Sequence, residues 1–495
     1  MTPVEAPDIL RALAQRLSAV AAALLDEAPV LGTPEHDASI LLDALVRSEC
    51  GHADAGATWL LLTALTGALP TSDEVQAAVR LLDREDPVVA TMLLLDDTRI
   101  VALERGNLAA ELDLLTGGVL VDVNHTAHSD RHTGIQRVVR QTVPRWVADH
   151  DVELVAWTEN ASCLRALTDQ ERDSVLTWDD AAPTPASGPT SATRLVVPWD
   201  CVVVLPEVPA VETSPALAAL ARHSGNRVVA IGYDAIPVIS ADLRPWNEPD
   251  LFVRYLTVIK HARRVAGISV TAAAEFRGFS ESLRSQGLAG PVVTEVMLAH
   301  DAVGVSRPEP RPQVRPSVLC VGSQEVHKNH LAVMHAAERL WRDGLDFSLT
   351  FVGRPGWDMS EFDAAVTALR TAGRPLRVVR GMTDAELAHA YADARFAIFP
   401  SLHEGYGLPV AEALAVGTPV ITSGFGSMRE IADGGGCLLV DPHDDDDILQ
   451  AMRSLLVDPA VADRLRAEAH ARPARTWDTY ATELWAEIVE TELTR

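Results

Sequence analysis

Two glutamates in a glycine-rich loop are the residues whose type and spacing best suit polar chemistry. Glu404 and Glu412 have seven residues between them, within PSLHEGYGLPVAEALAVGTPVITS, residues 400–423. Pro409 begins the predicted helix that carries Glu412, and Gly417 ends it. A carboxylate accepts two hydroxyl hydrogen bonds, which suits a ribose diol or a sugar ring, and a helix N-terminus attracts anions. Either glutamate alone could equally be solvated or complement the helix dipole.

A second strand-to-helix turn carries a cation. In CVGSQEVHKNH, residues 320–330, Gly322 makes the turn and Lys328 stands at the predicted helix start. The ammonium and the free N–H groups of the first helical turn together suit a diphosphate. His327 adds positive charge only when it is protonated. The equally weighted alternative is that His327 is a surface histidine without a role in binding.

Two loops in the first half of the chain also follow predicted strands. Gly134 comes after Thr133 at a predicted helix start, which fits either an anion-binding loop or a plain tight turn. Arg137 in the same helix suits either a phosphate or the solvated helix face. In AIGYDAIPV, residues 230–238, Asp234 is a candidate acceptor for sugar hydroxyls, with a strand-end turn residue as the alternative.

Metal chemistry is not indicated by the motifs. His125, His128, His132 and Asp130 lie near one another in sequence but lack the spacing of a metal-binding motif, so a polar loop is the preferred interpretation. The run Asp444–Asp447 precedes an apolar-periodic stretch and predicts a helix cap. The five cysteines form no CxxC pair, which disfavours a zinc cluster or a disulfide framework and fits a reducing compartment.

The elements that must position these residues form two α/β units preceded by helices. Up to about residue 109, apolar residues recur at helical spacing; from Gly118 onward, short β-branched runs alternate with amphipathic stretches. That alternation predicts parallel sheets covered by helices. It restarts after residues 306–316, where four of eleven residues are proline, so this segment is the predicted domain boundary. Residues 179–193, rich in Pro, Ser, Thr and Ala, predict a surface loop.

Length and charge narrow the classes of function. The chain has 495 residues and a formal net charge of −27. The length predicts several domains, and the charge disfavours binding to nucleic acid or to an anionic membrane surface. We find no secretory signal and no apolar run long enough to span a membrane, so we expect a cytoplasmic protein without strong membrane association.

Residues 400–423 resemble the EX7E motif of the retaining glycosyltransferases of family four (glycosyl transferases group 1), and the resemblance extends from about Gly118 to the C-terminus. It implies the α/β GT-B fold, in which two Rossmann-like domains face a cleft, here with an N-terminal all-helical extension. We expect this extension over residues 1–115, an acceptor-side domain over 116–310 and a nucleotide-sugar domain over 311–475. A helix over 476–495 is expected to pack back toward the acceptor-side domain.

The resemblance also assigns roles to single residues. Glu404 is expected beside the donor sugar, Glu412 on the nucleotide ribose and Lys328 on the diphosphate; Glu404, Lys328 and Asp234 are the expected catalytic residues. The expected donor-binding residues are Gly134, Gly322, Ser323, His327, Arg354, Met382, Gly405, Tyr406, Gly407, Leu408 and Glu412. Many relatives have arginine at the place of Ser323 or His327, and some have histidine at the place of Tyr233. The departures at Ser323 and His327 imply fewer permanent charges at the diphosphate, and Tyr233 lacks the imidazole on which a role of that histidine would rest.

On this resemblance we expect a hexosyltransferase-like enzyme that needs no metal or other cofactor. It would move a sugar from a UDP-, GDP- or dTDP-sugar to a hydroxyl of a soluble glycan, peptide or metabolite and keep the anomeric configuration. A non-catalytic nucleotide-sugar-binding scaffold and a GT-B sugar-nucleotide epimerase are the alternatives. The N-terminal helices hold no cluster of chemically active residues, so we expect a scaffold or homo-oligomerisation element there, with holding the acceptor as the alternative.

Overall fold

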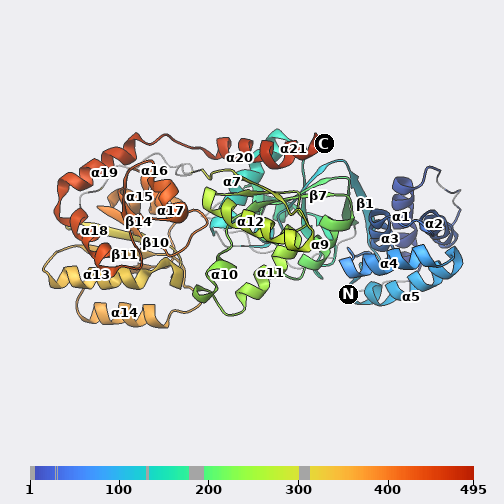
Figure 1. Ribbon diagram of the computed structural model, residues 1–495, viewed down its shortest axis with the longest axis horizontal. Helices are drawn as coiled ribbons and strands as arrows, with labels where there is room; N and C mark the ends of the chain where they lie inside the picture. Colours follow the sequence, from blue (N-terminus) through green and yellow to red (C-terminus); the bar gives the residue numbers. More distant parts are fainter. Residues whose placement is uncertain are drawn as a thin grey trace.

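The computed structural model describes residues 6–27, 29, 32–129, 133–177, 194–299, 311 and 313–494 (Figure 1). The predicted loop 179–193, most of the proline-rich segment 306–316, and Asp130 and His132 lie outside the described residues. Along the chain, the described residues form a helical part, a first lobe around a seven-stranded sheet and a second lobe around a six-stranded sheet. The domain limits at residues 115, 310 and 475 stay predictions.

Five helices make up the helical part. They are α1 (Ala6–Leu24), α2 (Pro34–Glu49), α3 (Ala55–Thr66), α4 (Ser72–Arg84) and α5 (Pro87–Arg105). Helix α3 is buried along nearly its whole length, because the other helices and the first lobe surround it. The fully buried Arg16 of α1 donates to the backbone carbonyls of Leu108 (2.9 Å) and Ala110 (2.7 Å) just before β1. One apolar core runs from these helices into the first sheet, so the helical part is fixed to the first lobe.

The first lobe contains a parallel sheet with one antiparallel edge strand. Its strand order is β4-β3-β2-β6-β7-β8-β9, and β4 alone runs antiparallel to its neighbour. The strands are β2 (Val119–Asp122), β3 (Glu153–Trp157), β4 (Leu164–Ala166), β6 (Val202–Leu205), β7 (Arg227–Gly232), β8 (Arg264–Gly267) and β9 (Val292–Glu295). A separate parallel pair joins β1 (Glu111–Thr116) to β5 (Arg194–Trp199). The helices are α6 (Asn124–His128), α7 (Gly134–Asp149), α8 (Asp169–Leu176), α9 (Ser214–His223), α10 (Ile236–Ile239), α11 (Glu248–Ile259) and α12 (Val270–Ser282), with short 3-10 turns η1 (Ala241–Leu243) and η2 (Leu283–Gln286).

The second lobe contains an all-parallel sheet of order β12-β11-β10-β13-β14-β15. The strands are β10 (Ser317–Val321), β11 (Ser348–Val352), β12 (Leu376–Val379), β13 (Phe396–Phe399), β14 (Val420–Ser423) and β15 (Cys437–Val440). The helices are η3 (Val326–Lys328), α13 (His330–Arg342), α14 (Ser360–Thr371), α15 (Asp384–Asp393), α16 (Leu408–Ala415), α17 (Gly426–Ala432), α18 (Asp445–Val457) and α19 (Pro459–Ala471). Asp444 caps α18 by accepting the N–H groups of Asp446 (2.9 Å) and Asp447 (3.3 Å), which confirms the predicted helix cap.

The end of the chain returns to the first lobe. After α19, helix α20 (Trp477–Trp485), the π-helical turn η4 (Ala486–Glu490) and α21 (Thr491–Leu493) run along the first lobe (Figure 1). Trp146 of α7 donates its indole N–H to the carbonyl of Ala481 (3.0 Å), and buried Arg264 donates to Glu492 (2.8 Å). A single apolar cluster contains side chains of both lobes and of α20. The lobes are therefore joined by packed contacts near the carboxyl ends of their strands, where parallel sheets place ligands.

Candidate functional site

The loop between β13 and α16 lies against the first lobe. At Gly405 an added Cβ would be 2.2 Å from the carbonyl oxygen of Tyr233, which follows β7, so only glycine allows this approach. Ser269 reinforces the contact by donating its hydroxyl to the carbonyl of Gly405 (2.6 Å). Gly407 has φ 111° directly before α16, a conformation that favours glycine. The backbone of the predicted sugar-binding loop is thus held between the two lobes.

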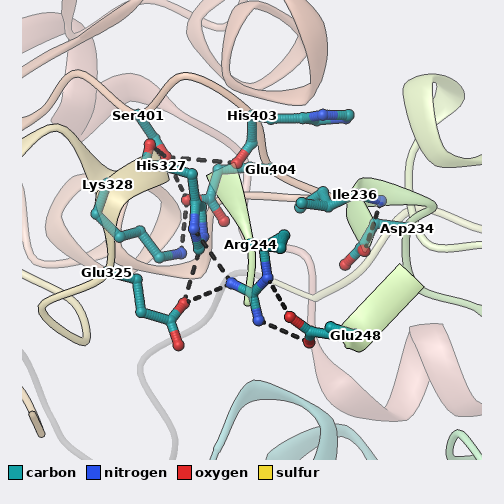
Figure 2. A network of polar contacts seen from close by, with 10 residues as sticks. All are labelled: Asp234, Ile236, Arg244, Glu248, Glu325, His327, Lys328, Ser401, His403 and Glu404. Carbon is teal, nitrogen blue, oxygen red and sulfur yellow. Dashed lines mark hydrogen bonds and ion pairs between the residues drawn. The ribbon is translucent and has the colours of Figure 1, made fainter. Parts of the chain in front are cut away.

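Lys328 and Glu404 form an ion pair at the meeting point of β10 and β13 (Figure 2). Lys328 Nζ donates to Glu404 Oε1 at 2.6 Å, and the hydroxyl of Ser401 donates to the same oxygen at 2.6 Å. The two charged side chains are only 15% and 10% exposed, so the pair is weakly screened by solvent. The ammonium also lies 5.3 Å from the centre of the Phe399 ring. The site therefore presents one cation and one carboxylate that hold each other in place.

Glu412 is engaged by protein groups from both lobes. Arg137 of α7 forms a short ion pair with Glu412 Oε1 and also donates to Asp384 (3.0 Å). The hydroxyl of Tyr391 donates to Glu412 Oε2 at 3.2 Å. Burial raises the pKa of Glu412, and the charge of Arg137 opposes that rise. The sequence suggested that Arg137 contacts either a phosphate or solvent, and neither interpretation predicted this ion pair between the lobes.

Asp234 and His403 lie where the first lobe meets the loop. Asp234 is half-buried and accepts the N–H of Ile236 (3.1 Å). Its burial, aided by the nearby carboxylates of Glu275 and Glu404, raises its pKa to about 6. His403 lies between Glu275 (2.7 Å from Nε2) and the hydroxyl of Ser240 (2.8 Å from Nδ1). Burial lowers the pKa of His403, but the hydrogen bond and charge of Glu275 outweigh that effect and leave the pKa raised. His403 thus ties the loop to the first lobe.

His327 is a buried, neutral histidine rather than a surface residue. Burial first, and then the charges of Lys328 and Arg244, lower its pKa to about 2. Its Nδ1 lies 3.2 Å from Nη1 of Arg244, and its backbone carbonyl accepts the N–H of Leu402 (2.7 Å). The same Nη1 donates to Glu325 (2.9 Å), while the other side of the guanidinium donates to Glu248 of α11 (2.7 and 2.8 Å) (Figure 2).

The remaining predicted residues lie at neighbouring strand ends. A Cβ at Gly134, the first residue of α7, would be 3.5 Å from Leu408 Cδ1, so the first-lobe glycine loop and α16 meet. The carbonyl of Gly322 approaches Gly353 so closely that a Cβ at Gly353 would be 1.9 Å from it, which brings together the ends of β10 and β11. Half-buried Ser323 follows Gly322 in this turn.

Three predicted residues farther along the chain differ in their solvent exposure and in their contacts. Arg354 is exposed, and its backbone carbonyl accepts the N–H of Gln324 (3.0 Å). Met382 is half-buried and packs against the apolar cluster shared by the lobes. Tyr406 is buried and donates its hydroxyl to the carbonyl of Leu298 (3.2 Å). The side chain of Tyr406 therefore fixes the loop to the first lobe.

Sequence reasoning missed four polar residues of this region: Arg244, Glu275, Ser401 and His403. His403 directly precedes Glu404 and lies within the segment already singled out, so its position was a usable signal. Arg244 precedes Pro245 in a loop with no recognisable spacing, and nothing in the sequence separates it from a surface arginine. Among the described residues, no group of His, Cys, Asp and Glu is arranged to hold a metal ion.

A family model described as "Glycosyl transferases group 1" matches residues 315–458, which contain Lys328, Glu404 and Glu412. Residues 315–458 belong to the glycosyl transferases group 1. The chain is 26% identical over 339 residues to the serotype-specific mannosyltransferase WbdA of Escherichia coli, an alignment covering 64% of this chain and 40% of WbdA. It is 29% identical over 229 residues to D-inositol 3-phosphate glycosyltransferase 1 of Catenulispora acidiphila, in an alignment that covers 42% of this chain and 55% of that protein. The chain spans about two fifths of the length of WbdA.

Solved structures share the arrangement of the two lobes. A sucrose-phosphate synthase from Thermosynechococcus elongatus superposes with a TM-score of 0.55 at 15% identity, covering 76% of this chain and 100% of that one. Anabaena Alr3699/HepE, solved in complex with UDP and glucose, superposes with a TM-score of 0.51 at 13% identity, covering 75% of this chain and 99% of that one. These structures confirm the expected GT-B fold, to which the N-terminal helices are added, and the match of residues 315–458 agrees with the expected group 1 family. No helix in the described ranges combines the length and apolarity needed to cross a bilayer.

Proposed function

We propose that this glycosyltransferase moves a sugar from a nucleoside-diphosphate donor to a hydroxyl acceptor and keeps the anomeric configuration. The observation that carries the proposal is the pairing of Lys328 with Glu404 at the adjacent ends of β10 and β13 in the second lobe. A cation and a carboxylate are gathered beside the loop that leads into α16, and a sugar diphosphate requires this combination of groups. The matched family and the likeness to the fold of Anabaena HepE support the same class of donor.

In the proposed reaction, the bond between C1 of the sugar and the diphosphate oxygen breaks, and its electron pair goes to the diphosphate. Lys328 stabilises the charge that develops there, because its ammonium is already fixed in a poorly solvated site. The acceptor oxygen forms the new bond to C1 on the face that the diphosphate leaves, and its proton passes to a diphosphate oxygen. Glu404 and the nearby Asp234 orient sugar hydroxyls, and no covalent sugar–enzyme intermediate is required.

Glu412 is proposed to bind the nucleotide ribose, which requires an exchange of partners. Both of its oxygens already accept hydrogen bonds, from Arg137 and from Tyr391. A ribose diol would replace at least one of them, and Arg137 would keep its second partner, Asp384, during the exchange. The reaction as proposed needs no metal or further cofactor. The strong negative charge of the chain favours an uncharged or cationic soluble acceptor over an anionic surface.

The test is donor consumption by the purified chain. UDP-, GDP- and dTDP-sugars are each incubated with candidate glycan, peptide and metabolite acceptors, and release of nucleoside diphosphate is measured. We expect release from one donor class that falls at least a hundredfold in Glu404→Gln and in Lys328→Met. Tight binding of a donor without turnover would favour the scaffold, and interconversion of the sugar nucleotide without release of diphosphate would favour the epimerase.

A further inference from the structure

The loop that carries Lys328 has too little positive charge for a diphosphate. Lys328 is already balanced by Glu404, Ser323 is uncharged and burial keeps His327 neutral. The same loop contributes a carboxylate, Glu325. A leaving diphosphate gains negative charge as its bond to the sugar breaks, so a second cation nearby would stabilise the product side of the reaction. The structure places such a cation on the opposite lobe.

Arg244 reaches this loop from the first lobe. Its Nε and Nη2 donate side-on to Glu248, which fixes the guanidinium to α11. Nη1 is the end that faces the second lobe, where it lies 2.9 Å from Glu325 Oε2 and 3.2 Å from His327 Nδ1 (Figure 2). The side chain is 15% exposed, so its charge is only partly screened by water. Arg244 is therefore anchored on one lobe and presents its remaining donors to the other.

We propose that Arg244 is a second cation for the leaving diphosphate, delivered to the Lys328 loop by the first lobe. This inference rests on the proposed function. Glu325 occupies Nη1 until the donor binds, and a phosphate oxygen then takes its place, because a guanidinium binds phosphate at least as well as carboxylate. Glu248 holds the guanidinium in both states. Donor binding thereby adds a bridge between the lobes where the sugar bond breaks.

The experiment compares two substitutions that give opposite results. Binding of UDP, GDP and dTDP to the purified full chain is measured by calorimetry, with the corresponding nucleosides as probes that lack phosphate. We expect Arg244→Gln to weaken diphosphate binding about tenfold or more and to leave nucleoside binding unchanged. Glu325→Gln should strengthen diphosphate binding, because it removes the carboxylate that competes for Nη1. Arg254→Gln, which alters an exposed arginine of α11, the helix that carries Glu248, is the control and should change neither.

The following results would contradict the role proposed for Arg244. If Arg244→Gln and Glu325→Gln weaken binding equally, Arg244 only clamps the loop. Unchanged binding in Arg244→Gln also overturns the inference, and the proposed function then still stands if turnover depends on Glu404 and Lys328. If the unaltered chain binds none of the three diphosphates and releases none from the donors, both proposals fail. Glu325→Gln keeps the test decisive even if Arg244→Gln does not fold.

A second inference comes from the surface of α5, at the end of the molecule away from the second lobe (Figure 1). Seven large apolar side chains of this helix are exposed: Val88, Val89, Met92, Leu93, Leu95, Ile100 and Leu103. Met92 is 68% and Leu103 is 70% exposed, while the opposite face of the helix is buried through Ala90, Leu94 and Thr98. An exposed apolar face of this size, with the charged Asp96 and Arg99 within it, marks an interaction surface.

The exposed face of α5 is complementary to itself. Met92, Asp96, Arg99 and Leu103 are spaced by four, three and four residues, so they form one stripe along the helix. When two copies of α5 lie antiparallel about a two-fold axis between residues 97 and 98, Met92 of one faces Leu103 of the other. In the same register Asp96, which lies 3.7 Å from Arg99 of its own helix, also faces Arg99 of the second copy. Apolar residues thus meet apolar residues and opposite charges meet.

The geometry points to a second copy of this chain as the partner of α5. A 19-residue helix is about 28 Å long, and two such helices bury less than the roughly 1,200 Å² of the smallest stable interfaces. We therefore expect a dimer that dissociates at about micromolar concentration. The inference is independent of the proposed reaction.

Charge reversal tests the register. The mass of the full chain is followed from about 1 to 100 μM by sedimentation. We expect a dimer at the upper end that Met92→Glu abolishes, with helix content unchanged by circular dichroism. Asp96→Arg should weaken association about tenfold, because two arginines then meet, and the double reversal Asp96→Arg with Arg99→Asp should restore it. A monomer at every concentration, a dimer insensitive to Met92→Glu, or a monomer that floats with phosphatidylcholine vesicles each contradicts self-association through α5.

Discussion

The ion pair between Lys328 and Glu404 gives the most direct test of the site. Its members are 15% and 10% exposed, so removing one partner leaves the other charge poorly solvated. Such a loss typically costs about 3–5 kcal/mol, and the hydroxyl of Ser401, which still donates to Glu404, places Lys328→Met at the lower end. If the free energy of unfolding falls by about 3 kcal/mol per molar of urea, a loss of about 3 kcal/mol lowers the urea midpoint of second-lobe unfolding by about 1 M.

The double variant separates stability from catalysis. Lys328→Met and Glu404→Gln together leave no unpaired charge, so we expect the double variant to recover at least half of the stability that either single variant loses. Its turnover should stay at least a hundredfold below that of the unaltered chain, because the cation at the diphosphate is gone. The measurements are urea midpoints followed by tryptophan fluorescence and release of nucleoside diphosphate. Stability losses that simply add, within about 0.5 kcal/mol, would refute the pairing, and normal turnover of the double variant would refute its catalytic role.

Three further predictions concern neighbouring residues. Because burial raises the pKa of Asp234 from 3.8 to about 6, the folded chain binds this proton more tightly than the unfolded chain, and stability falls as pH rises through that window. Asp234→Asn should remove about 2 kcal/mol of this fall in the free energy of unfolding measured at pH 4 and 7. In Glu412→Gln we expect binding of the ribonucleoside diphosphate to weaken about tenfold and to match that of its 2′,3′-dideoxy analogue, whereas an unchanged preference for ribose would contradict the ribose role. Gly405→Ala should lower the melting temperature and abolish turnover, because its Cβ would collide with the carbonyl of Tyr233; Gly278→Ala, which has no atom within 4 Å of its Cβ, should do neither.

The sequence predicted those parts of the molecule that depend on local order. Alternation of β-branched and amphipathic stretches indicated two parallel sheets, and strand-to-helix turns located Gly134, Gly322 and the loop at Glu404. A cap such as Asp444 is also local, because the side chain bonds the N–H groups two and three residues later. The resemblance of residues 400–423 to a motif of the glycosyl transferases group 1 agrees with the family model that matches residues 315–458.

Contacts between residues far apart in the chain could not be predicted in this way. Arg137 and Glu412 are 275 positions apart, and Arg244 and His327 are 83 apart, so no local spacing connects them. The neutrality of His327 and the raised pKa of Asp234 depend on how completely other elements exclude water from them. The exposure of one face of α5 likewise depends on which helices pack against the other.

The difference between the features that the sequence predicted and those that it did not has a physical cause. Backbone conformation and amphipathic periodicity are set within a few residues, so the sequence alone determined the elements, the turns and the residue types that each strand end offers. Charge state, pairing and solvent exposure are set by the atoms that surround a group in space. Only the tertiary structure decided which cation meets which carboxylate at the site: the second sheet brings Lys328 to Glu404, and the packing of the two lobes brings Arg137 to Glu412 and Arg244 to Glu325.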